Sequence, residues 1–318
     1  MSIRKKIKKN LSNSLLGVYS LHFLRKTREI WALRLNDYKY LRKVYKKRFG
    51  RGLNLRDPQT FFEKLNWLKL FYHTKEIERC SDKYLARGYL EEKGYKKYLN
   101  KLIGVYDRAK DIDFKALPQK FVIKVSHGSS WNVICTDKSK LNVKKTIAKL
   151  NCWQKEDISV FGREWNYRSS PRKIIIEEFI EAPSLVDYKF FCLNGKVTFM
   201  QVNHDEGLMH YIDYYDANFN RLHMKLYGYN SCSNDLEKPP KFDEMKKIAE
   251  ELAKNFPSIR VDFYNPDERI FLGELTFFVG GGLMPFEPKD TPYDKQFGDA
   301  LVLPEPNYNL DLYNKLKK

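Results

Sequence analysis

The fifteen residues from 121 to 135, FVIKVSHGSSWNVIC, constrain the fold most, because two β-type runs flank a loop of small residues. Lys124 lies in the first run, just before the loop of residues 127–130. A loop of this kind can direct backbone N–H groups at phosphate oxygens, while the lysine supplies positive charge from a rigid strand. The stretch therefore predicts a phosphate-binding loop between two strands. A nucleotide site would need further partners from the rest of the chain.

A second candidate for a site is the segment of residues 171–181, PRKIIIEEFIE. Three consecutive isoleucines followed by Glu177 and Glu178 predict a buried strand that emerges at an edge or a hinge. Carboxylates are rarely buried without a partner, so packing alone does not account for this pair. The preceding residues 154–170 are polar and aromatic without a clear period, and they are predicted to form a mobile loop.

A third candidate is the segment of residues 258–282, SIRVDFYNPDERIFLGELTFFVGGG, which predicts two strands joined by a turn. Arg260 and Asp262 are two residues apart and share one side of their strand. Glu274 lies on the partner strand, where it is expected opposite or diagonal to Asp262. Two carboxylates and an arginine on one face indicate a metal–phosphate site, with Mg²⁺ as the favoured ion, or alternatively an internal salt bridge. The three glycines that follow would let the backbone approach a ligand closely.

Other patterns help to set the fold class. Alternating apolar residues flank Asn194-Gly195, the residue pair of a type I′ turn, which predicts a hairpin. Residues 241–256 have the apolar period of an amphipathic helix. In the predicted helix SDKYLARGYLEEKGY, Asp82, Lys83 and Arg87 either line a substrate edge or form an exposed face with local ion pairs.

Positive charge is concentrated near the N-terminus. Of the net charge of +18, most comes from residues 1–51, which hold sixteen Lys or Arg against Glu29 and Asp37. This segment is predicted to be helical with breaks near Gly17 and Asn36. Its apolar run, residues 15–24, is too short to span a bilayer, and no small-residue cleavage site follows it. Such a basic helix fits an anionic membrane surface, or a solvated or protein-packed helix. Nucleic acid is not expected, because no recognisable binding module accompanies it.

The cysteines and histidines do not suggest a metal centre. Five cysteines are widely spaced without a C-x-x-C pair, so neither a disulfide framework nor structural zinc is expected, and a reducing cytoplasm fits. His204 and His210 are six residues apart, which is no distinctive ligand spacing. Sequences typical of a Walker A loop, a G-x-G-x-x-G loop or a G-x-S-x-G nucleophile are absent.

Six segments, in this order, resemble the ATP-grasp superfamily and, within it, the TupA-like family found with bacterial cell-surface polysaccharide genes. They are TFFEKLNWLKL, SDKYLARGYL, LPQKFVIKVSHGSSWNVICTDKSKL, PRKIIIEEFIE, DYKFFCLNGK, and RVDFYNPDERIFLGELTF with the following GGG. The likeness runs from about residue 50 to the C-terminus. It implies an α+β fold in which two α+β subdomains clamp a nucleotide. The expected parts are a basic helical arm (1–50), a helical region before the clamp (51–116), a lid subdomain (117–182) and a metal-binding catalytic subdomain (183–318).

The resemblance also implies roles for individual residues, with ATP and Mg²⁺ as the cofactors. Lys124 would contact the α- and β-phosphates, the loop would close over them, and the end of the glutamate strand would meet the adenine. Asp187 would lie near the ribose or phosphates, and Lys189 would reach the triphosphate. Arg260 would stabilise charge on the transferred phosphoryl group or the tetrahedral intermediate. The implied nucleotide-binding residues are Lys124, His127, Gly128, Ser129, Ser130, Glu177, Glu178, Phe179, Ile180 and Asp187; the catalytic residues are Lys189 and Arg260; the metal ligands are Asp262, Glu274 and Thr276.

Two of these residues carry an open question. Thr276 stands where the superfamily commonly has asparagine, and a threonine hydroxyl has a shorter reach, so a second Mg²⁺ would be held weakly or through water. His127 is either a phosphate contact or a polar loop residue.

The function implied by the resemblance is an ATP- and Mg²⁺-dependent ligase that joins a carboxylate to an amine through an acylphosphate. Its pathway would be the synthesis of a capsule, an O-antigen or a teichuronic-type polysaccharide. A sugar phosphotransferase, a glycosyltransferase of the same pathway and a non-catalytic membrane scaffold are the alternatives. The expected partners are a surface glycan or lipid-linked sugar, and an anionic membrane that residues 1–51 would touch from the cytoplasmic side.

Overall fold

The computed structural model describes residues 14–318 except residues 183, 208, 233 and 290. The helices are α2 (Leu15–Leu33), α3 (Asp37–Phe49), α4 (Phe61–Phe71), α5 (Lys75–Ser81), α6 (Lys83–Glu92), α7 (Val143–Lys155), α8 (Ser159–Gly162), α9 (Phe242–Ala253), α10 (Tyr293–Ala300) and α11 (Leu310–Lys317). The strands are β1 (Leu102–Tyr106), β2 (Phe121–Val125), β3 (Asn132–Cys135), β4 (Ile174–Glu178), β5 (Asp187–Leu193), β6 (Lys196–Glu206), β7 (Met209–Asp216), β8 (Arg221–Leu222), β9 (Lys225–Leu226), β10 (Ser258–Tyr264), β11 (Phe271–Thr276) and β12 (Phe286–Glu287). The predicted α+β class is confirmed.

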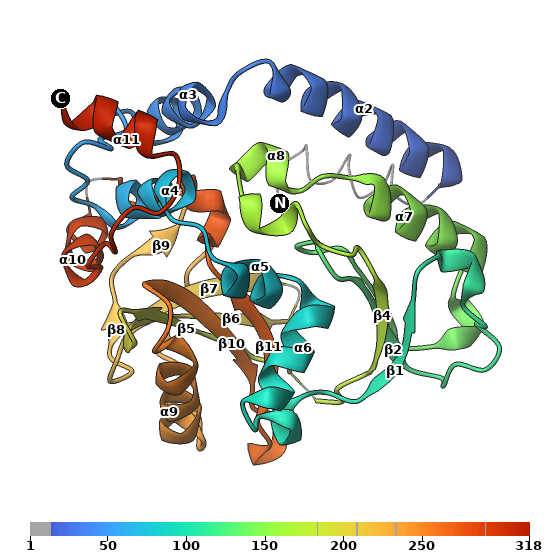
Figure 1. The fold of residues 1–318 in the computed structure, drawn as a ribbon. Coiled ribbons are helices and arrows are strands. Elements are labelled where there is room, and N and C mark those ends of the chain that lie inside the picture. Colours follow the sequence, from blue (N-terminus) through green and yellow to red (C-terminus); the bar gives the residue numbers. More distant parts are fainter. Residues whose placement is uncertain (1–13, 183, 208, 233, 290) are drawn as a thin grey trace.

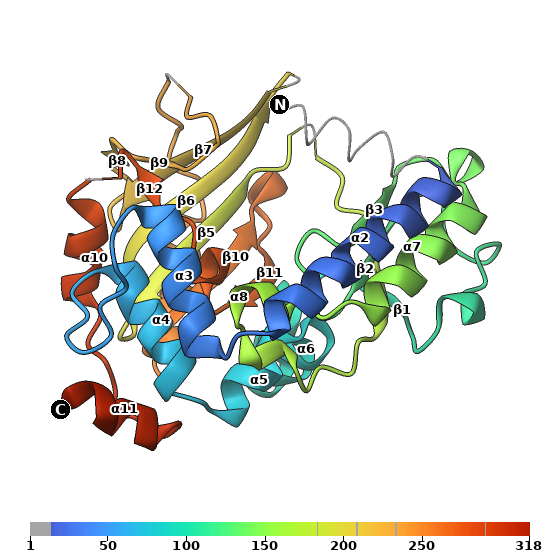
Figure 2. The ribbon, with the colours of Figure 1, turned by 90° about the horizontal axis from the view of Figure 1, so that it is seen from above.

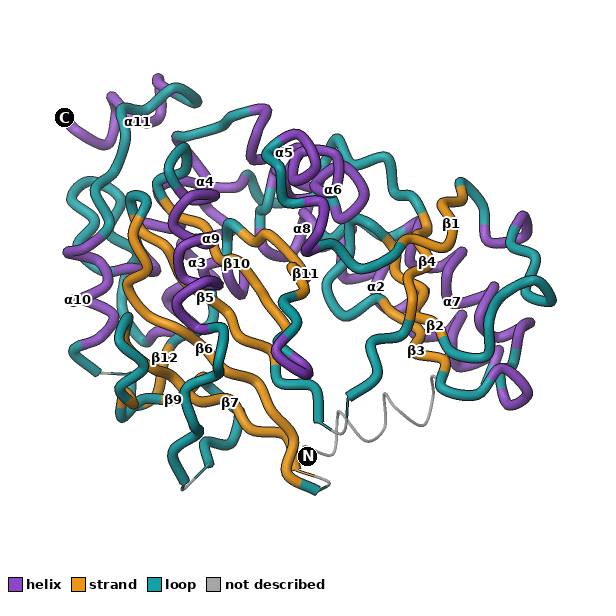
Figure 3. Tube along the Cα trace, turned by 90° about the horizontal axis from the view of Figure 1, so that it is seen from below, coloured by secondary structure: helices purple, strands orange, loops and turns teal. Residues whose placement is uncertain are grey.

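Two antiparallel sheets lie on either side of α5 and α6 (Figure 1). The smaller sheet has the strand order β1-β4-β2-β3, and the larger sheet has the order β11-β10-β5-β6-β7-β8. Seen from below, the two sheets remain separate (Figure 3). Each sheet has its own apolar core, so the molecule consists of two lobes that each bury their own hydrophobic surface.

Alternation along β2 gives the small sheet one apolar face and one polar face. The odd-numbered residues of β2 are fully buried in the core that α7 covers. Successive side chains of a strand point to opposite faces, so Lys124 points away from α7. Glu177, at the end of the central strand β4, lies on this same face as Lys124. The small sheet therefore presents charged groups toward α6 and the large sheet.

Aromatic side chains attach helices to both faces of the large sheet. Phe190 of β5 packs on Phe242 of α9, with ring centroids 5.7 Å apart. On the other face, Phe199 of β6 contacts Phe61 of α4 at 5.7 Å and stacks on Phe297 of α10 at 3.9 Å. Aromatic rings bury large areas, so these contacts fix the helices against the sheet.

The predicted hairpin at Asn194-Gly195 is confirmed. It joins β5 to β6, and the φ angles of Asn194 (+47°) and Gly195 (+81°) are both left-handed, as a type I′ turn requires. The amphipathic helix predicted over residues 241–256 is also confirmed as α9. This helix buries its apolar stripe against the large sheet.

The prediction of a mobile loop over residues 154–170 is wrong. The segment contains α8 and a 3₁₀ turn, and Val160 and Trp165 are buried. Arg163 donates hydrogen bonds to the carbonyls of Ala32 (2.7 Å) and Leu35 (3.0 Å) at the end of α2. These short turns are held by contacts with residues that are distant in sequence. Their apolar residues therefore show neither a helical nor a strand period.

The N-terminal part differs from its prediction at one boundary. Ser14 caps α2 through the backbone N–H of Gly17, so α2 begins near Gly17 and includes it in its first turn. The break predicted near Asn36, which caps α3, is confirmed. The difference is β1, which pairs with β4, so the small sheet begins at residue 102 and not at the predicted boundary of 117. Residues 1–13 of the predicted arm lie outside the described residues. Within the described residues, no helix has both the length and the apolar character to cross a bilayer.

Candidate active site

Three adjoining cavities lie between the two sheets. Lys83, Lys124 and Glu274 line both the first and the second cavity. Asp187, Lys189 and Glu274 line both the second and the third cavity. The charged residues therefore lie where the cavities meet, and one ligand could contact all of them.

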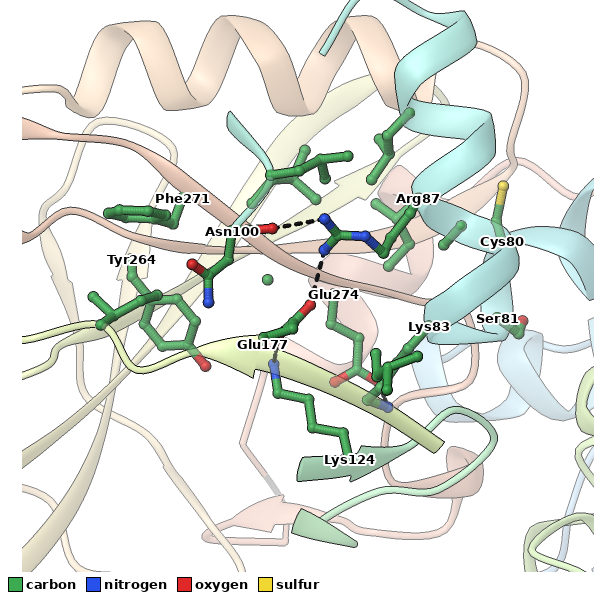
Figure 4. A pocket seen from close by; sticks show the side chains of 18 residues that line it. Cys80, Ser81, Lys83, Arg87, Asn100, Lys124, Glu177, Tyr264, Phe271 and Glu274 are labelled. Carbon is green, nitrogen blue, oxygen red and sulfur yellow. Dashed lines mark hydrogen bonds and ion pairs between the residues drawn. The ribbon is translucent and has the colours of Figure 1, made fainter. Parts of the chain in front are cut away.

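Glu177 is the buried charge of the first cavity (Figure 4). Its Oε2 lies 2.5 Å from Lys124 Nζ, and its Oε1 lies 2.8 Å from the Arg87 guanidinium. A carboxylate with only 6 % exposure needs such partners, because burial of an unpaired charge is costly. The resemblance implies that Lys124 contacts the phosphates and Glu177 the adenine side of one nucleotide, and the two side chains lie in direct contact.

The residues after Glu177 follow the alternation of the strand. Glu178 is exposed and pairs with Lys101 at 2.9 Å, on the side away from Glu177. Ile180 lines the first cavity. Phe179 lies between them and is half-buried. Of the predicted adenine-binding segment, the side chains of Glu177 and Ile180 are therefore the ones that border the cavity.

The small-residue loop closes over the second cavity. Gly128 and Ser130 line this cavity, and Ser129 and Ser130 line the third. A Cβ atom on Gly128 would lie 2.1 Å from the Trp131 ring, so this position requires glycine. Trp131 braces the loop at Gly128, and Gly128, Ser129 and Ser130 border the cavities.

Replacing Gly128 by alanine is expected to lower both the stability and the affinity for nucleotide, because Trp131 must move to admit the methyl group. Overpacking of this kind costs about 1–3 kcal/mol. Thermal unfolding and nucleotide titration would measure the two effects. Gly52→Ala is the matched control, since nothing lies within 4 Å of a Cβ there. Equal stability and affinity in both variants would contradict the bracing role of Trp131.

The side chain of His127 does not line the second cavity. The ring is 1 % exposed, and Nε2 lies 3.1 Å from the carbonyl oxygen of Glu156. Burial lowers the pKa of His127 to about 4, so the imidazole is neutral at pH 7. These contacts favour the role of a buried residue that anchors the loop over that of a phosphate ligand.

The face of the large sheet that borders the second cavity carries the predicted charged cluster. Asp262 on β10 pairs in register with Glu274 on β11 and with Lys189 on β5. Arg260 donates two hydrogen bonds to Asp262, at 2.6 and 2.7 Å, and one to the Thr276 hydroxyl at 3.1 Å. The predicted position of Glu274 opposite Asp262 is confirmed.

Lys189 links this cluster to Asp187. Its Nζ lies 2.5 Å from Asp187 Oδ2 and 2.6 Å from Asp262 Oδ2. The other oxygen of Asp187, Oδ1, is buried and has no hydrogen-bond partner among the described residues. Asp187 thus has a buried oxygen that a cation could contact.

The pKa values of Asp187 and Asp262 are shifted in opposite directions. Burial raises the pKa of Asp187, and the negative charge of Asp262 adds to this effect. Burial would also raise the pKa of Asp262, but Arg260 and Lys189 beside it hold that pKa below the usual value. Asp262 is therefore charged at neutral pH. A cation beside Asp187 would favour its charged form.

Helix α6 contributes two cations whose partners sequence reasoning missed. Lys83 Nζ lies 3.2 Å from Glu274 Oε1 and 2.6 Å from the Gly128 carbonyl oxygen, and Arg87 contacts Glu177 and the Asn100 carbonyl (Figure 4). The local i,i+4 pairing considered for them is wrong, because both partners are distant in sequence. Lys83 and Arg87 are one helical turn apart, which puts both on one side of α6. This spacing was the sequence signal that the two cations act on a common site.

Asp82 holds α6 against the small sheet. It caps α6 through the backbone N–H groups of Tyr84 and Leu85 and accepts a hydrogen bond from Ser126 Oγ at 2.6 Å. The backbone N–H of Lys83 donates to the Ser126 carbonyl at 2.9 Å. Asp82 therefore positions Lys83 beside the loop and does not itself line the cavities described.

The third cavity, of about 430 Å³, is the largest space next to the charged cluster. Aromatic and amide side chains line it, including Phe61, Gln201, Asn203, His210 and Tyr214. It is lined in part by the segment from Asn203 to Tyr229. His204, by contrast, is buried on the opposite face of β6 and lies 2.9 Å from Asp213.

The three glycines after β11 serve mainly the packing between helices. A Cβ on Gly281 would lie 3.0 Å from Gly162 of α8, and one on Gly282 would lie 3.1 Å from Asn66 of α4. All three have left-handed φ angles, and Gly280 alone of them borders the third cavity. These glycines were predicted to let a ligand approach the backbone closely. In the structure they mainly let α8 and α4 approach it.

The family model described as TupA-like ATPgrasp matches residues 63–302. No curated protein matches the chain.

Solved structures that match part of the chain include three ligases. The D-alanine–D-alanine ligase from Bacillus anthracis has 18 % identity and a TM-score of 0.39, over 63 % of this chain and 57 % of that one. The corresponding enzyme from Helicobacter pylori has 16 % identity and a TM-score of 0.39, over 72 % and 60 %. The L-amino acid ligase from Bacillus licheniformis has 14 % identity and a TM-score of 0.41, over 72 % and 49 %. This chain therefore spans less than two thirds of each.

Proposed function

The chain belongs to the TupA-like ATP-grasp family, and on that premise we propose that its central cavities bind ATP and Mg²⁺ and activate a carboxylate for ligation to an amine. The observation that carries the proposal is the charged cluster of β5, β10 and β11, which faces the loop after Lys124 across one cavity. A triphosphate with its metal is the ligand that matches carboxylates on one wall and lysines with a backbone loop on the other.

The residues of the large sheet fit a magnesium ion. Asp187 has a buried oxygen without a hydrogen-bond partner, and Asp262 and Glu274 supply further carboxylate oxygens on the same face. Hard oxygen ligands of this kind are those that Mg²⁺ prefers. Asp187, Asp262 and Glu274 would hold the ion, with Thr276 near them. When bound, Mg²⁺ neutralises charge on the phosphates that it contacts.

Three lysines are available for the phosphates: Lys83, Lys124 and Lys189. Each is paired with a carboxylate, at distances of 3.2 Å or less. Binding of a polyanion would exchange these carboxylate partners for phosphate oxygens. The lysines thereby keep a counter-charge in both states, which limits the cost of burying them.

The proposed reaction has two steps. A carboxylate oxygen of one substrate attacks the γ-phosphorus of ATP, the bond to the bridging oxygen breaks, and an acylphosphate and ADP form. The amine of a second substrate then attacks the acyl carbon, loses a proton, and expels inorganic phosphate to give an amide. Arg260, which lines the third cavity, would stabilise negative charge as it develops on the acyl oxygen.

The substrate class we propose is a bacterial cell-surface polysaccharide or its lipid-linked precursor. The third cavity adjoins the charged cluster and combines aromatic faces with the amides of Gln201 and Asn203. Aromatic faces contact sugar rings, and amides donate to and accept from their hydroxyl groups. A uronic acid would supply the carboxylate, and an amino acid would supply the amine.

The test uses purified protein with ATP, Mg²⁺, a uronate-containing oligosaccharide and a mixture of amino acids. We expect ADP, free phosphate and an amide in equal amounts. Phosphorylated oligosaccharide in place of free phosphate would identify a phosphotransferase. ATP binding without ADP formation for any pair of substrates would contradict the ligase.

A further inference from the structure

The helix α2 presents an apolar surface that the fold does not use. Eight of the fifteen exposed large apolar side chains in the described residues lie on this one helix. Six of them define its outer face: Leu16, Tyr19, Phe23, Leu24, Ile30 and Trp31. Soluble proteins expose such side chains singly, and a contiguous patch marks a surface for interaction.

The opposite side of α2 is already occupied. Val18 packs with Ala148 and Cys152 of α7, and both His22 and Arg25 bind the carboxylate of Glu156, at 3.2 and 2.5 Å. Positions 18, 22 and 25 recur at helical spacing and so share one side of the helix. The outer face therefore points away from α7, and Figure 2 shows α2 lying alongside α7 at the periphery of the small lobe.

Basic residues border the outer face. Lys26 and Arg28 flank it on the two sides, and Arg34 follows it. The one acidic residue of α2, Glu29, is paired with Lys26 at 2.8 Å. Five more Lys or Arg lie in residues 4–9 of the sequence. A ligand that is both apolar and negatively charged would match this surface.

We propose that the outer face of α2 docks the protein on an anionic lipid surface. Its aliphatic and aromatic side chains would enter the headgroup region, while the flanking basic residues contact lipid phosphates. A second copy of the chain would bring the same positive charge against this face, which disfavours self-association there. The inference is independent of the ATP site.

The experiment is sedimentation of the full chain with vesicles of phosphatidylcholine alone or with 30 % phosphatidylglycerol. We expect binding to the anionic vesicles and at least about tenfold weaker binding to the neutral ones. Phe23→Ser with Trp31→Ser should weaken anionic binding at least about tenfold, because two apolar side chains no longer insert. The matched control is Val302→Ser with Leu310→Ser, which removes two exposed apolar side chains outside α2 and should bind as the wild type does.

Several outcomes would overturn the proposal. The double variant at Phe23 and Trp31 could bind anionic vesicles as the wild type does, which would assign the contact to the basic residues alone. The wild type could bind neither vesicle. Light scattering could instead reveal a dimer that the double variant dissociates, in which case a second copy covers the outer face. Unchanged melting temperatures in all variants ensure that each outcome reports on the surface.

Discussion

Replacing Glu274 by glutamine is expected to abolish ATP-dependent turnover and to weaken divalent-metal binding by at least about 100-fold. The amide keeps the shape of the side chain but removes the charge that faces Asp262 across β10 and β11. It also removes the ionic partner of Lys83. Electron paramagnetic resonance of Mn²⁺ in the presence of ADP measures the metal, and ADP release measures turnover.

The control for this substitution is Glu178→Gln. Glu178 is an exposed carboxylate that pairs with Lys101 on the side away from the cavity. Its variant should bind Mn²⁺ and turn over ATP as the wild type does. If the Glu274→Gln protein keeps wild-type Mn²⁺ affinity, the metal site is contradicted. The carboxylates would then form an internal salt-bridge cluster, which is the alternative drawn from the sequence.

Replacing Lys124 by alanine is expected to weaken ATP binding about 100-fold, which corresponds to about 2.7 kcal/mol. The change removes one cation for the phosphates and leaves Glu177 with Arg87 as its remaining ionic partner. The lost cation and the less neutralised carboxylate of Glu177 both disfavour the binding of a polyanion beside β2 and β4. Unlike the loss of Glu274, the loss of Lys124 should weaken binding with and without Mg²⁺, and calorimetric titration in both conditions separates the two.

Lys120→Ala provides the matched control for Lys124. Lys120 immediately precedes β2 and pairs with exposed Glu181 at 2.8 Å. Surface pairs of this kind contribute little, so its loss should leave ATP affinity unchanged. Equal losses in the two variants would mean that total positive charge, and not the position of Lys124, governs binding.

The strand-borne parts of the site could be predicted because a strand has a strict period of two. That period puts Arg260 and Asp262 on one side of β10. The turn between β10 and β11 then limits where Glu274 can lie, and the structure pairs it with Asp262. The same period assigns Lys124 to the face opposite the core. In each case, local geometry is enough to orient the side chain.

The contacts between elements could not be predicted, since they depend on how the lobes meet. Lys83 and Arg87 are adjacent on α6, yet their partners Glu274 and Glu177 are 191 and 90 residues away. The packing of residues 154–170 is of the same kind, because Arg163 is held by carbonyls of α2 and its linker. No local pattern encodes such pairs, and so the sequence left them open.

The most direct test of the nucleotide site is isothermal titration of the wild-type chain with a non-hydrolysable ATP analogue, with and without Mg²⁺, and with a UDP-sugar in parallel. We expect one analogue bound per chain, tighter binding when Mg²⁺ is present, and no heat from the UDP-sugar. Binding of the UDP-sugar by a folded chain that ignores the ATP analogue would contradict the proposed ATP site.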